Sequence, residues 1–213
     1  RGHPSRIVQG VFLEPALRAD RERGRHERRS GDTERRRATI LFADITGFTT
    51  LTERLGAERA YPVVAGCLQL LDATARTHGG TVEKHLGDCV MALFGVPEAI
   101  EDAPRAAVNA AIEMRRRVRD YAGRLGGDVG LDVHSGINTG VAVAGDISGP
   151  LMREFAVMGD PVGVADELKD LAPAGHVYVG VEVQRATREV FEYRELDAST
   201  RAGRVVPVQV FAL

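Results

Sequence analysis

Apolar residues in the first half of the chain alternate between runs typical of buried strands and spacings typical of helices. Residues 38–45 (ATILFADI) are almost wholly apolar, which predicts a strand buried on both faces. Gly79-Gly80 is a typical helix stop, and Leu86-Gly87-Asp88 is a typical hairpin turn. Taken in order, the pattern predicts a strand at 38–45, helices at 46–55 and 57–78, strands at 81–85 and 89–94, and a helix at 103–121.

The second half of the chain mixes short strands with short helices. The pattern predicts strands near 130–137, 141–146 and 155–158, a helix over 160–171, a strand over 177–179, a helix over 182–190 and a last strand over 205–211. Pro207 indicates that the last strand lies at an edge of the sheet. This order predicts an α+β fold close to the split βαβ plan, with a largely antiparallel sheet and the helices packed on one face.

Composition places the chain among globular domains. Its 213 residues are 44% hydrophobic and 27% charged, with a formal net charge of −2, so a disordered chain and a nucleic-acid-binding protein are not expected. No apolar run approaches the roughly 18 residues that a membrane helix needs, and no signal peptide is recognisable. Cys67 and Cys89 match no metal-ligand spacing, and we expect free, buried thiols and a cytoplasmic location.

The first 37 residues differ from the rest of the chain. They contain eleven arginines against six acidic residues, and residues 18–37 hold no apolar side chain larger than alanine. We favour a solvated helix or linker for residues 1–37, ahead of a domain over 38–213. The alternative is a basic arm that binds nucleic acid or a membrane surface.

Two aspartates are the main candidates for chemistry. Asp44 ends the first predicted strand, and Asp88 lies at the hairpin turn. If the hairpin pairs with that strand, the two carboxylates and the Ile45 carbonyl form an oxygen-rich site suited to Mg²⁺ or Mn²⁺. The N–H groups of Thr46, Gly47 and Phe48, at a helix start, would then face substrate phosphates. Each aspartate taken singly is equally typical of a turn or a helix cap.

Other polar residues give weaker signals. Lys84 is one of only two lysines among 28 basic residues, and it is interpreted either as a contact to a nucleotide base or as a surface lysine. His85 is interpreted as a surface residue. The pair His134-Ser135 lacks the GxSxG sequence of a hydrolase nucleophile, and the chain has no P-loop and no zinc motif.

Three segments carry a family resemblance. FADITGFT (42–49), GGTVEKHLGDCVMALFG (79–95) and SGINTGVAVAGD (135–146) resemble the catalytic domain of class III nucleotide cyclases, the adenylate and guanylate cyclases, and the likeness extends to the C-terminus. It implies a ferredoxin-like palm that works as a dimer with active sites shared across the interface. It also implies two divalent ions per site, Mg²⁺ or Mn²⁺, and conversion of ATP or GTP to a 3′,5′-cyclic nucleotide and pyrophosphate.

The resemblance also assigns roles to single residues and exposes departures. In the family, one protomer binds the metals, which here implies Asp44, Ile45 and Asp88. The other protomer reads the base with a lysine, matched by Lys84. The family's second base contact, its ribose-orienting asparagine and its transition-state arginine fall on Ala156, Gly163 and Glu167. A pyrophosphate-side cation would be Arg201 or Arg204.

These departures leave three hypotheses for function. The first is an adenylate cyclase domain with degenerate transition-state residues, whose homodimer has weak activity. The second is the metal-donating half of a heterodimeric cyclase, and the third is a catalytically silent domain that binds nucleotide for regulation or only dimerises. Guanylate specificity is disfavoured, because the chain keeps Lys84 where guanylate cyclases normally have a glutamate.

Overall fold

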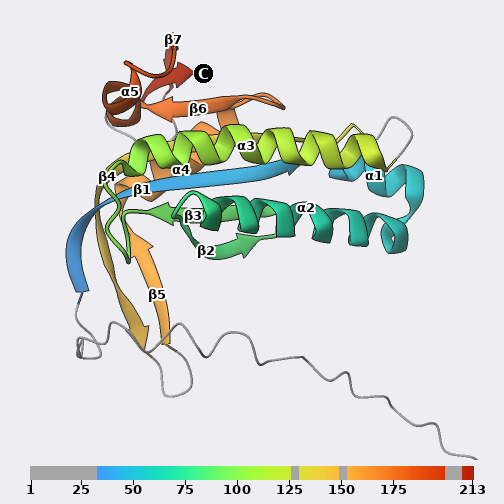
Figure 1. Cartoon of the computed structure of the whole chain (residues 1–213), viewed down its shortest axis with the longest axis horizontal. Helices are drawn as coiled ribbons and strands as arrows, with labels where there is room; N and C mark the ends of the chain where they lie inside the picture. The colour runs from blue at the N-terminus through green and yellow to red at the C-terminus, as the bar shows by residue number, and fades with distance from the viewer. Residues whose placement is uncertain (1–32, 126–129, 149–152, 200–207) are drawn as a thin grey trace, which may run out of the picture.

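The computed structural model describes residues 33–125, 130–148, 153–199 and 208–213. Within these residues the centre of the fold is one mixed sheet (Figure 1). Its strands are β1 (Thr33–Thr46), β2 (Thr81–Leu86), β3 (Cys89–Phe94), β4 (Asp132–Ser148), β5 (Arg153–Met158), β6 (Val177–Gly180), β7 (Arg194–Ser199) and β8 (Val208–Ala212). Their order is β2-β3-β1-β4-β6-β8-β7, with β5 paired to β4, and only the pair β4–β6 is parallel. The expected antiparallel-dominated α+β fold is confirmed.

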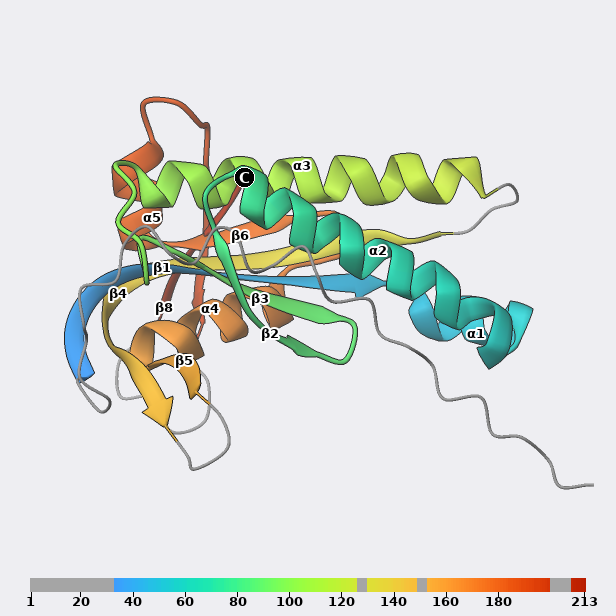
Figure 2. The ribbon, with the colours of Figure 1, turned by 60° about the horizontal axis from the view of Figure 1, so that its bottom comes forward.

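Helices cover both faces of this sheet. The helices are α1 (Phe48–Leu55), α2 (Ala57–Thr77), α3 (Ala103–Arg124), α4 (Asp160–Leu171) and α5 (Val181–Thr187). Figure 2 shows α3 on one side of the sheet and α4 on the other. The expectation that all helices pack on one face is therefore wrong for α4.

The pleat of β1 explains the two-sided packing. Leu41, Ala43 and Ile45 belong to the core cluster that includes α2 and α3. Ile40 and Phe42, on the alternate face, belong to a second cluster with Ala165 of α4. Because successive strand side chains point to opposite faces, an apolar run such as residues 38–45 requires cover on both sides.

Gly136 of β4 allows α4 to approach the sheet closely. A Cβ at this position would collide with the Ala165 carbonyl oxygen and the Lys169 amide nitrogen of α4. The second cover over the sheet therefore depends on a residue without a side chain, and it brings the end of α4 near the start of β4.

Two strands differ from the sequence expectation. β4 is continuous, although its polar centre suggested two separate strands. That centre is paired and buried: the Thr139 hydroxyl lies 2.7 Å from the Thr39 hydroxyl, and Asn138 donates to the Pro161 carbonyl. β1 begins at Thr33, so residues 33–37 are not the expected helix or linker but pair with β4.

The C-terminal strands also differ. β7 was not expected from the sequence, and β8 lies between β6 and β7 rather than at an edge. Pro207, on which the edge expectation depended, lies outside the described residues, as do residues 1–32 and both Arg201 and Arg204. Cys67 and Cys89 are buried, free thiols as expected. No helix in the described part of the chain has the length and apolar character to cross a membrane.

Candidate metal and nucleotide site

Asp44 and Asp88 meet where the β2–β3 hairpin pairs with the end of β1. Asp44 is opposite Cys89 in the antiparallel register, and the Ile45 amide donates to the Asp88 carbonyl at 3.4 Å. The N–H and C=O of one strand residue point toward the same neighbour, so the Ile45 carbonyl also faces this hairpin turn. The structure thus brings the three expected metal ligands to one place.

The electrostatics of Asp88 indicate a site for a cation. Partial burial, and then the nearby Asp44 carboxylate, raise the pKa of Asp88. Two carboxylates that disfavour each other's ionisation are stabilised by a divalent cation, and oxygen ligands are those that Mg²⁺ and Mn²⁺ prefer. Among the described residues no three acidic, histidine or cysteine side chains converge as a metal cluster, so the candidate ligand set is two carboxylates with a backbone carbonyl.

His134 holds Asp44 in place, a role that sequence reasoning missed. It lies opposite Asp44 in the β1–β4 register, and its Nε2 is 2.9 Å from the Asp44 carboxylate. Its Nδ1 is 2.7 Å from the Ala172 carbonyl. Both ring nitrogens face acceptors, so a doubly protonated ring satisfies both. The hydrogen bond to Asp44 accordingly raises the pKa of His134.

Lys169 is the second residue that sequence reasoning missed. Its Nζ lies 2.7 Å from Asp170 and 3.2 Å from Asp166, and its side chain is only 14% exposed. Burial alone would lower the pKa of Lys169, but the hydrogen bonds to these aspartates outweigh it and raise the pKa. Its charge also lowers the pKa of Asp88, which places a cation of α4 near the two metal-binding candidates.

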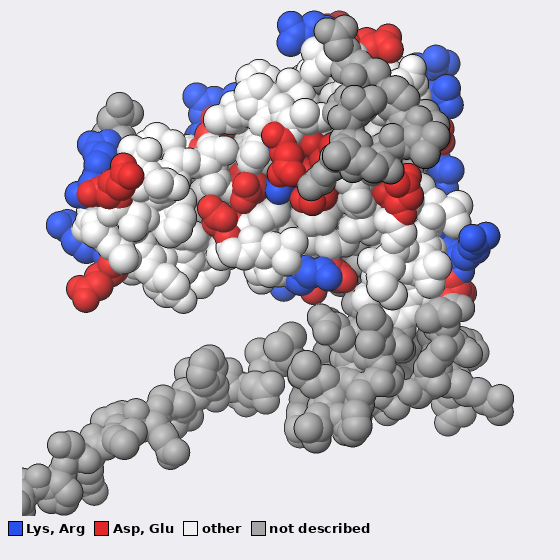
Figure 3. Space-filling view, turned by 180° about the vertical axis from the view of Figure 1, so that it is seen from behind, with Lys and Arg blue, Asp and Glu red and all other residues white. Residues whose placement is uncertain are grey.

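Acidic side chains gather near the middle of the face seen from behind. In that view most of the described surface is uncharged, and the red side chains near its middle have little blue among them (Figure 3). Acidic side chains disfavour a polyphosphate unless cations are bound beside them. A nucleotide at this face would therefore depend on bound cations.

The turn after β1 places the start of α1 beside Asp44. Gly47 caps α1 with φ 88° and ψ 0°, and no side chain caps this helix start. A Cβ on Gly47 would collide with the Gly130 carbonyl oxygen, so the turn requires glycine. The first N–H groups of a helix have no partner within the helix, and a helix start of this kind is suited to phosphate oxygens. Thr46, also expected here, pairs with Asp132 of β4.

The two residues expected to contact the base, Lys84 and Ala156, lie on β2 and β5. Lys84 is exposed on β2, with its Nζ 3.2 Å from Glu83. Ala156 is opposite Gly145 of β4. Gly145 is eleven residues from His134, or about 36 Å along the strand at about 3.3 Å per residue. Ala156 therefore does not reach the Asp44 site of its own protomer.

Gly163 and Glu167, expected at the family's asparagine and arginine positions, lie one turn apart on α4. Gly163 is exposed, whereas Glu167 is 4% exposed. Glu167 and Lys169 are two residues apart, about 200° around the helix, so they point to opposite sides of α4. Lys169 consequently does not take the place of the family's arginine at position 167.

The comparisons with known proteins agree with the sequence resemblance. Residues 32–211 match the family described as the adenylate and guanylate cyclase catalytic domain. Adenylate cyclase 1 of Rhizobium meliloti is 27% identical over 183 residues, covering 83% of this chain and 27% of that protein. Adenylate cyclase of Anabaena cylindrica is 30% identical over 148 residues, covering 66% of this chain and 28% of that protein. The chain thus spans about a quarter of the length of these relatives.

A solved structure gives the same result for the fold. The crystal structure of the adenylyl cyclase CyaB from P. aeruginosa has a TM-score of 0.79 to this chain and 30% sequence identity. The alignment covers 85% of this chain and 95% of that one. With a family match over nearly all the described residues and a fold that agrees throughout, the chain belongs to the class III nucleotide cyclases, as an adenylate and guanylate cyclase catalytic domain.

Proposed function

We propose that this domain binds ATP with divalent metal ions at Asp44 and Asp88 and is an adenylate-type cyclase whose own transition-state residues are degenerate. The observation that carries the proposal is the meeting of Asp44, Asp88 and the Ile45 carbonyl beside the start of α1, which no side chain caps. When bound, two Mg²⁺ or Mn²⁺ ions supply activation of the ribose 3′-hydroxyl and neutralise charge on the triphosphate.

The chain keeps residues suited to bind the nucleotide but lacks the side chains that the family uses to orient the ribose and stabilise the transition state. The Thr46–Phe48 turn binds phosphate oxygens through its N–H groups, and His134 fixes the orientation of Asp44. Gly163 offers no side chain to orient the ribose, and Glu167 is an anion where the family has a cation. Loss of one transition-state donor costs about 3–4 kcal/mol, so we expect tight binding and slow turnover.

We propose that the active unit is a dimer. Val141, Val143 and Met158 are exposed on the β4–β5 arm, and Val143 is opposite Met158 in the register. Neighbouring exposed apolar side chains are typical of a protein interface. A second copy would bring Lys84 and Ala156 to a site that they do not reach within their own protomer. A different cyclase domain as partner would also supply the missing asparagine and arginine.

A second candidate function is nucleotide binding without turnover. It is favoured by the burial of Glu167, because a buried acidic side chain at the arginine position does not reach into a shared site. In this case the domain would act in regulation through its ATP-bound state.

A cyclase assay with MnATP tests these alternatives. We expect low cyclic AMP formation by the purified chain, loss of it in Asp44→Asn, and an increase on Gly163→Asn. An increase on mixing with a domain that supplies both missing residues would assign the heterodimer. Position 167 is buried, so an arginine there can disturb the fold. The double variant Gly163→Asn/Glu167→Arg is therefore compared with Gly163→Asn alone, and thermal melting checks that each is folded.

Binding is measured separately, by calorimetry. MnATP binding without any cyclic AMP formation, in the wild type, in Gly163→Asn and in the double variant, would assign the silent regulatory domain. Absence of MnATP binding by folded protein would refute the nucleotide site itself.

A further inference from the structure

A hollow of about 650 Å³ lies on the α3 side of the sheet, next to β6. Its volume is in the range of pockets that hold small organic ligands. Arg115, Arg116 and Arg119 line it, with Asp120 as the one acidic lining residue. We call this hollow the α3 arginine pocket, and its polar wall is predominantly cationic.

The arginines of this pocket are incompletely paired. The Arg115 Nε is buried and has no hydrogen-bond partner within the described part of the chain. It lies 3.6 Å from Asp132, and the Arg119 Nε lies 4.0 Å from the same side chain. Charge-assisted hydrogen bonds are about 2.7–2.9 Å long. The buried Nε itself is shielded from the pocket, so a bound anion would contact the other N–H groups of Arg115 and Arg119, whose ion pairs with Asp132 are long.

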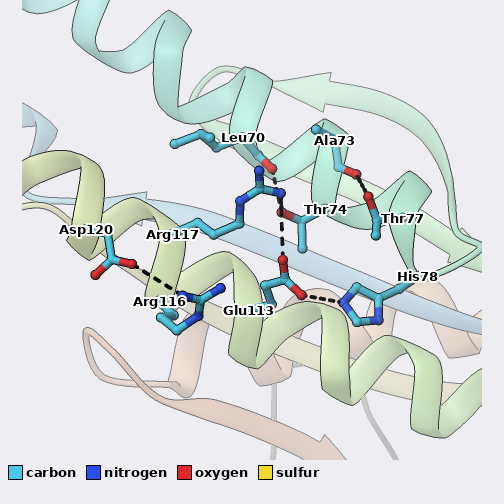
Figure 4. Close-up of polar contacts among 9 residues, drawn as sticks. All are labelled: Leu70, Ala73, Thr74, Thr77, His78, Glu113, Arg116, Arg117 and Asp120. Carbon is cyan, nitrogen blue, oxygen red and sulfur yellow. Dashed lines mark hydrogen bonds and ion pairs between the residues drawn. The ribbon is translucent and has the colours of Figure 1, made fainter.

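On the side of α3 that faces α2, polar side chains form shorter contacts (Figure 4). There Arg117 donates to the Thr74 hydroxyl of α2 at 2.9 Å. The Glu113 Oε2 lies 2.9 Å from the Nε2 of His78, at the C-terminal end of α2. Arg116, which lines the pocket, has a longer ion pair of 3.5 Å with Asp120. The arginine that faces α2 is used in packing, whereas the pocket arginines are held more loosely.

The pocket is also shaped by a glycine and by apolar side chains. Gly175 has φ +76°, and a Cβ there would lie 2.6 Å from the Asp132 Oδ2 and 3.0 Å from the Arg115 Nη2, so the Asp132 carboxylate also lies at this wall. The Arg115 guanidinium therefore packs against the Gly175 backbone, which fixes its position. Ile112 and Val177 form an apolar part of the wall.

We propose that the α3 arginine pocket binds an organic anion. Its carboxylate or phosphate group would contact Arg115 and Arg119, because a guanidinium binds either oxyanion through parallel N–H donors. Its apolar part would lie against Ile112 and Val177. This site does not depend on the proposed cyclase activity.

The pocket and the candidate nucleotide site lie at the same end of the sheet. Asp132, which Arg115 and Arg119 hold, is opposite Thr46 across β1 and β4. Asp44 shares the face of β1 that carries Phe42 and packs toward α4, whereas the pocket is lined by α3. A binding test must therefore separate the two sites, which the variant Asp44→Asn does.

The test is a titration of the whole chain at constant ionic strength with sodium hexanoate and with phenyl phosphate. Calorimetry gives the affinity, and amide NMR shifts of Gly175 and Val177 report the location. We expect saturable binding of at least one probe, stronger than that of acetate or inorganic phosphate. In Arg119→Gln binding should weaken about ten-fold or more. Arg105→Gln is the matched control, an exposed arginine of α3 outside the pocket.

The outcomes discriminate clearly. Weakening in Arg119→Gln, with Arg105→Gln and Asp44→Asn unchanged, supports the pocket, and the preferred probe tells whether it takes carboxylates or phosphates. No saturable binding of either probe overturns the proposal. Equal weakening in Arg105→Gln, loss of binding in Asp44→Asn, or equal affinity for acetate and hexanoate overturns it as well.

Discussion

Gly47→Ala is the substitution that most directly tests how the phosphate-binding turn is built. Gly47 has φ 88° and ψ 0°, a left-handed conformation that costs an alanine about 1–2 kcal/mol. An added Cβ also collides with the Gly130 carbonyl oxygen and lies 3.1 Å from its carbon, and overpacking of backbone costs about 1–3 kcal/mol. Alanine also restricts the unfolded chain more than glycine does, which offsets about 0.4–1 kcal/mol of this destabilisation. The expected net destabilisation is about 3 kcal/mol.

Gly56→Ala is the matched control for this prediction. Gly56 also has a positive φ, of 78°, but a Cβ there meets no atom within 4 Å. Its replacement therefore carries only the backbone cost, about 1–3 kcal/mol before the unfolded-state gain. Because Gly56 has ψ 154° where Gly47 has ψ 0°, the two backbone costs differ, and the comparison isolates the Gly47 turn through MnATP affinity rather than through stability.

Urea unfolding measures the stabilities, and calorimetry with MnATP measures binding. We expect Gly47→Ala to be about 3 kcal/mol less stable than the wild type and to bind MnATP at least about ten-fold more weakly, because the turn must move to relieve the collision. Gly56→Ala should bind like the wild type. A loss of less than about 1 kcal/mol in Gly47→Ala would refute the packing argument, and equal MnATP affinities of the two variants would refute the role of the turn.

Three further predictions concern the site and the dimer. The pKa of His134 is raised by Asp44, so its stabilising contribution is present below about pH 6.5 and is lost as pH rises through the raised value. The stability gap between wild type and His134→Gln should therefore be larger at pH 6 than at pH 8.5 in metal-free urea unfolding, and a constant gap would contradict this. Ala156→Thr should improve discrimination of ATP over GTP several-fold in competition binding, because a neutral hydrogen bond contributes about 0.5–1.5 kcal/mol. Val143→Arg should give a folded monomer by light scattering with an unchanged melting temperature, whereas a persistent dimer would place the interface away from Val143 and Met158.

The elements with clear periodicity could be predicted from the sequence alone. The helix expected over 160–171 is α4, and the hairpin with Asp88 at its turn is as expected. β7 and β4 differ from the expectation, and exposure of one and strand pairing of the other explain the difference. β7 (RELDAS) is a short edge strand whose only apolar residues are Leu196 and Ala198, too few for a clear strand pattern. β4 was expected to break at its polar centre, but pairing with β1 satisfies those side chains.

The site was predictable only in part, since motifs reveal ligands and not their neighbours. Asp44 and Asp88 stand in recognisable segments. The contact of His134 with Asp44 depends instead on the register of two strands 90 residues apart. No local pattern encodes that register, and the same holds for Lys169, which reaches the site only because Gly136 lets α4 pack closely.

The contact with His134 changes what the retained Asp44 implies. His134 is largely buried and presents a proton to Asp44, so a neutral asparagine at position 44 keeps the acceptor but replaces a charge-assisted hydrogen bond by a weaker one, at a cost of about 1 kcal/mol. The fold therefore has its own reason to keep Asp44, whether or not the domain turns over ATP. Loss of activity in Asp44→Asn has two explanations, a lost metal ligand and a weakened fold.

Asp88→Asn separates these two explanations. The pKa of Asp88 is raised by burial and by Asp44, so the folded state disfavours its ionised form, and this penalty grows as pH rises through the raised value. A neutral asparagine removes the penalty. We expect the metal-free variant to be as stable as the wild type or more stable at pH 8, yet to lose Mn²⁺ binding measured by electron paramagnetic resonance. If Asp88→Asn kept its Mn²⁺ affinity, the two aspartates would not be joint metal ligands, and their approach would be only a feature of the hairpin.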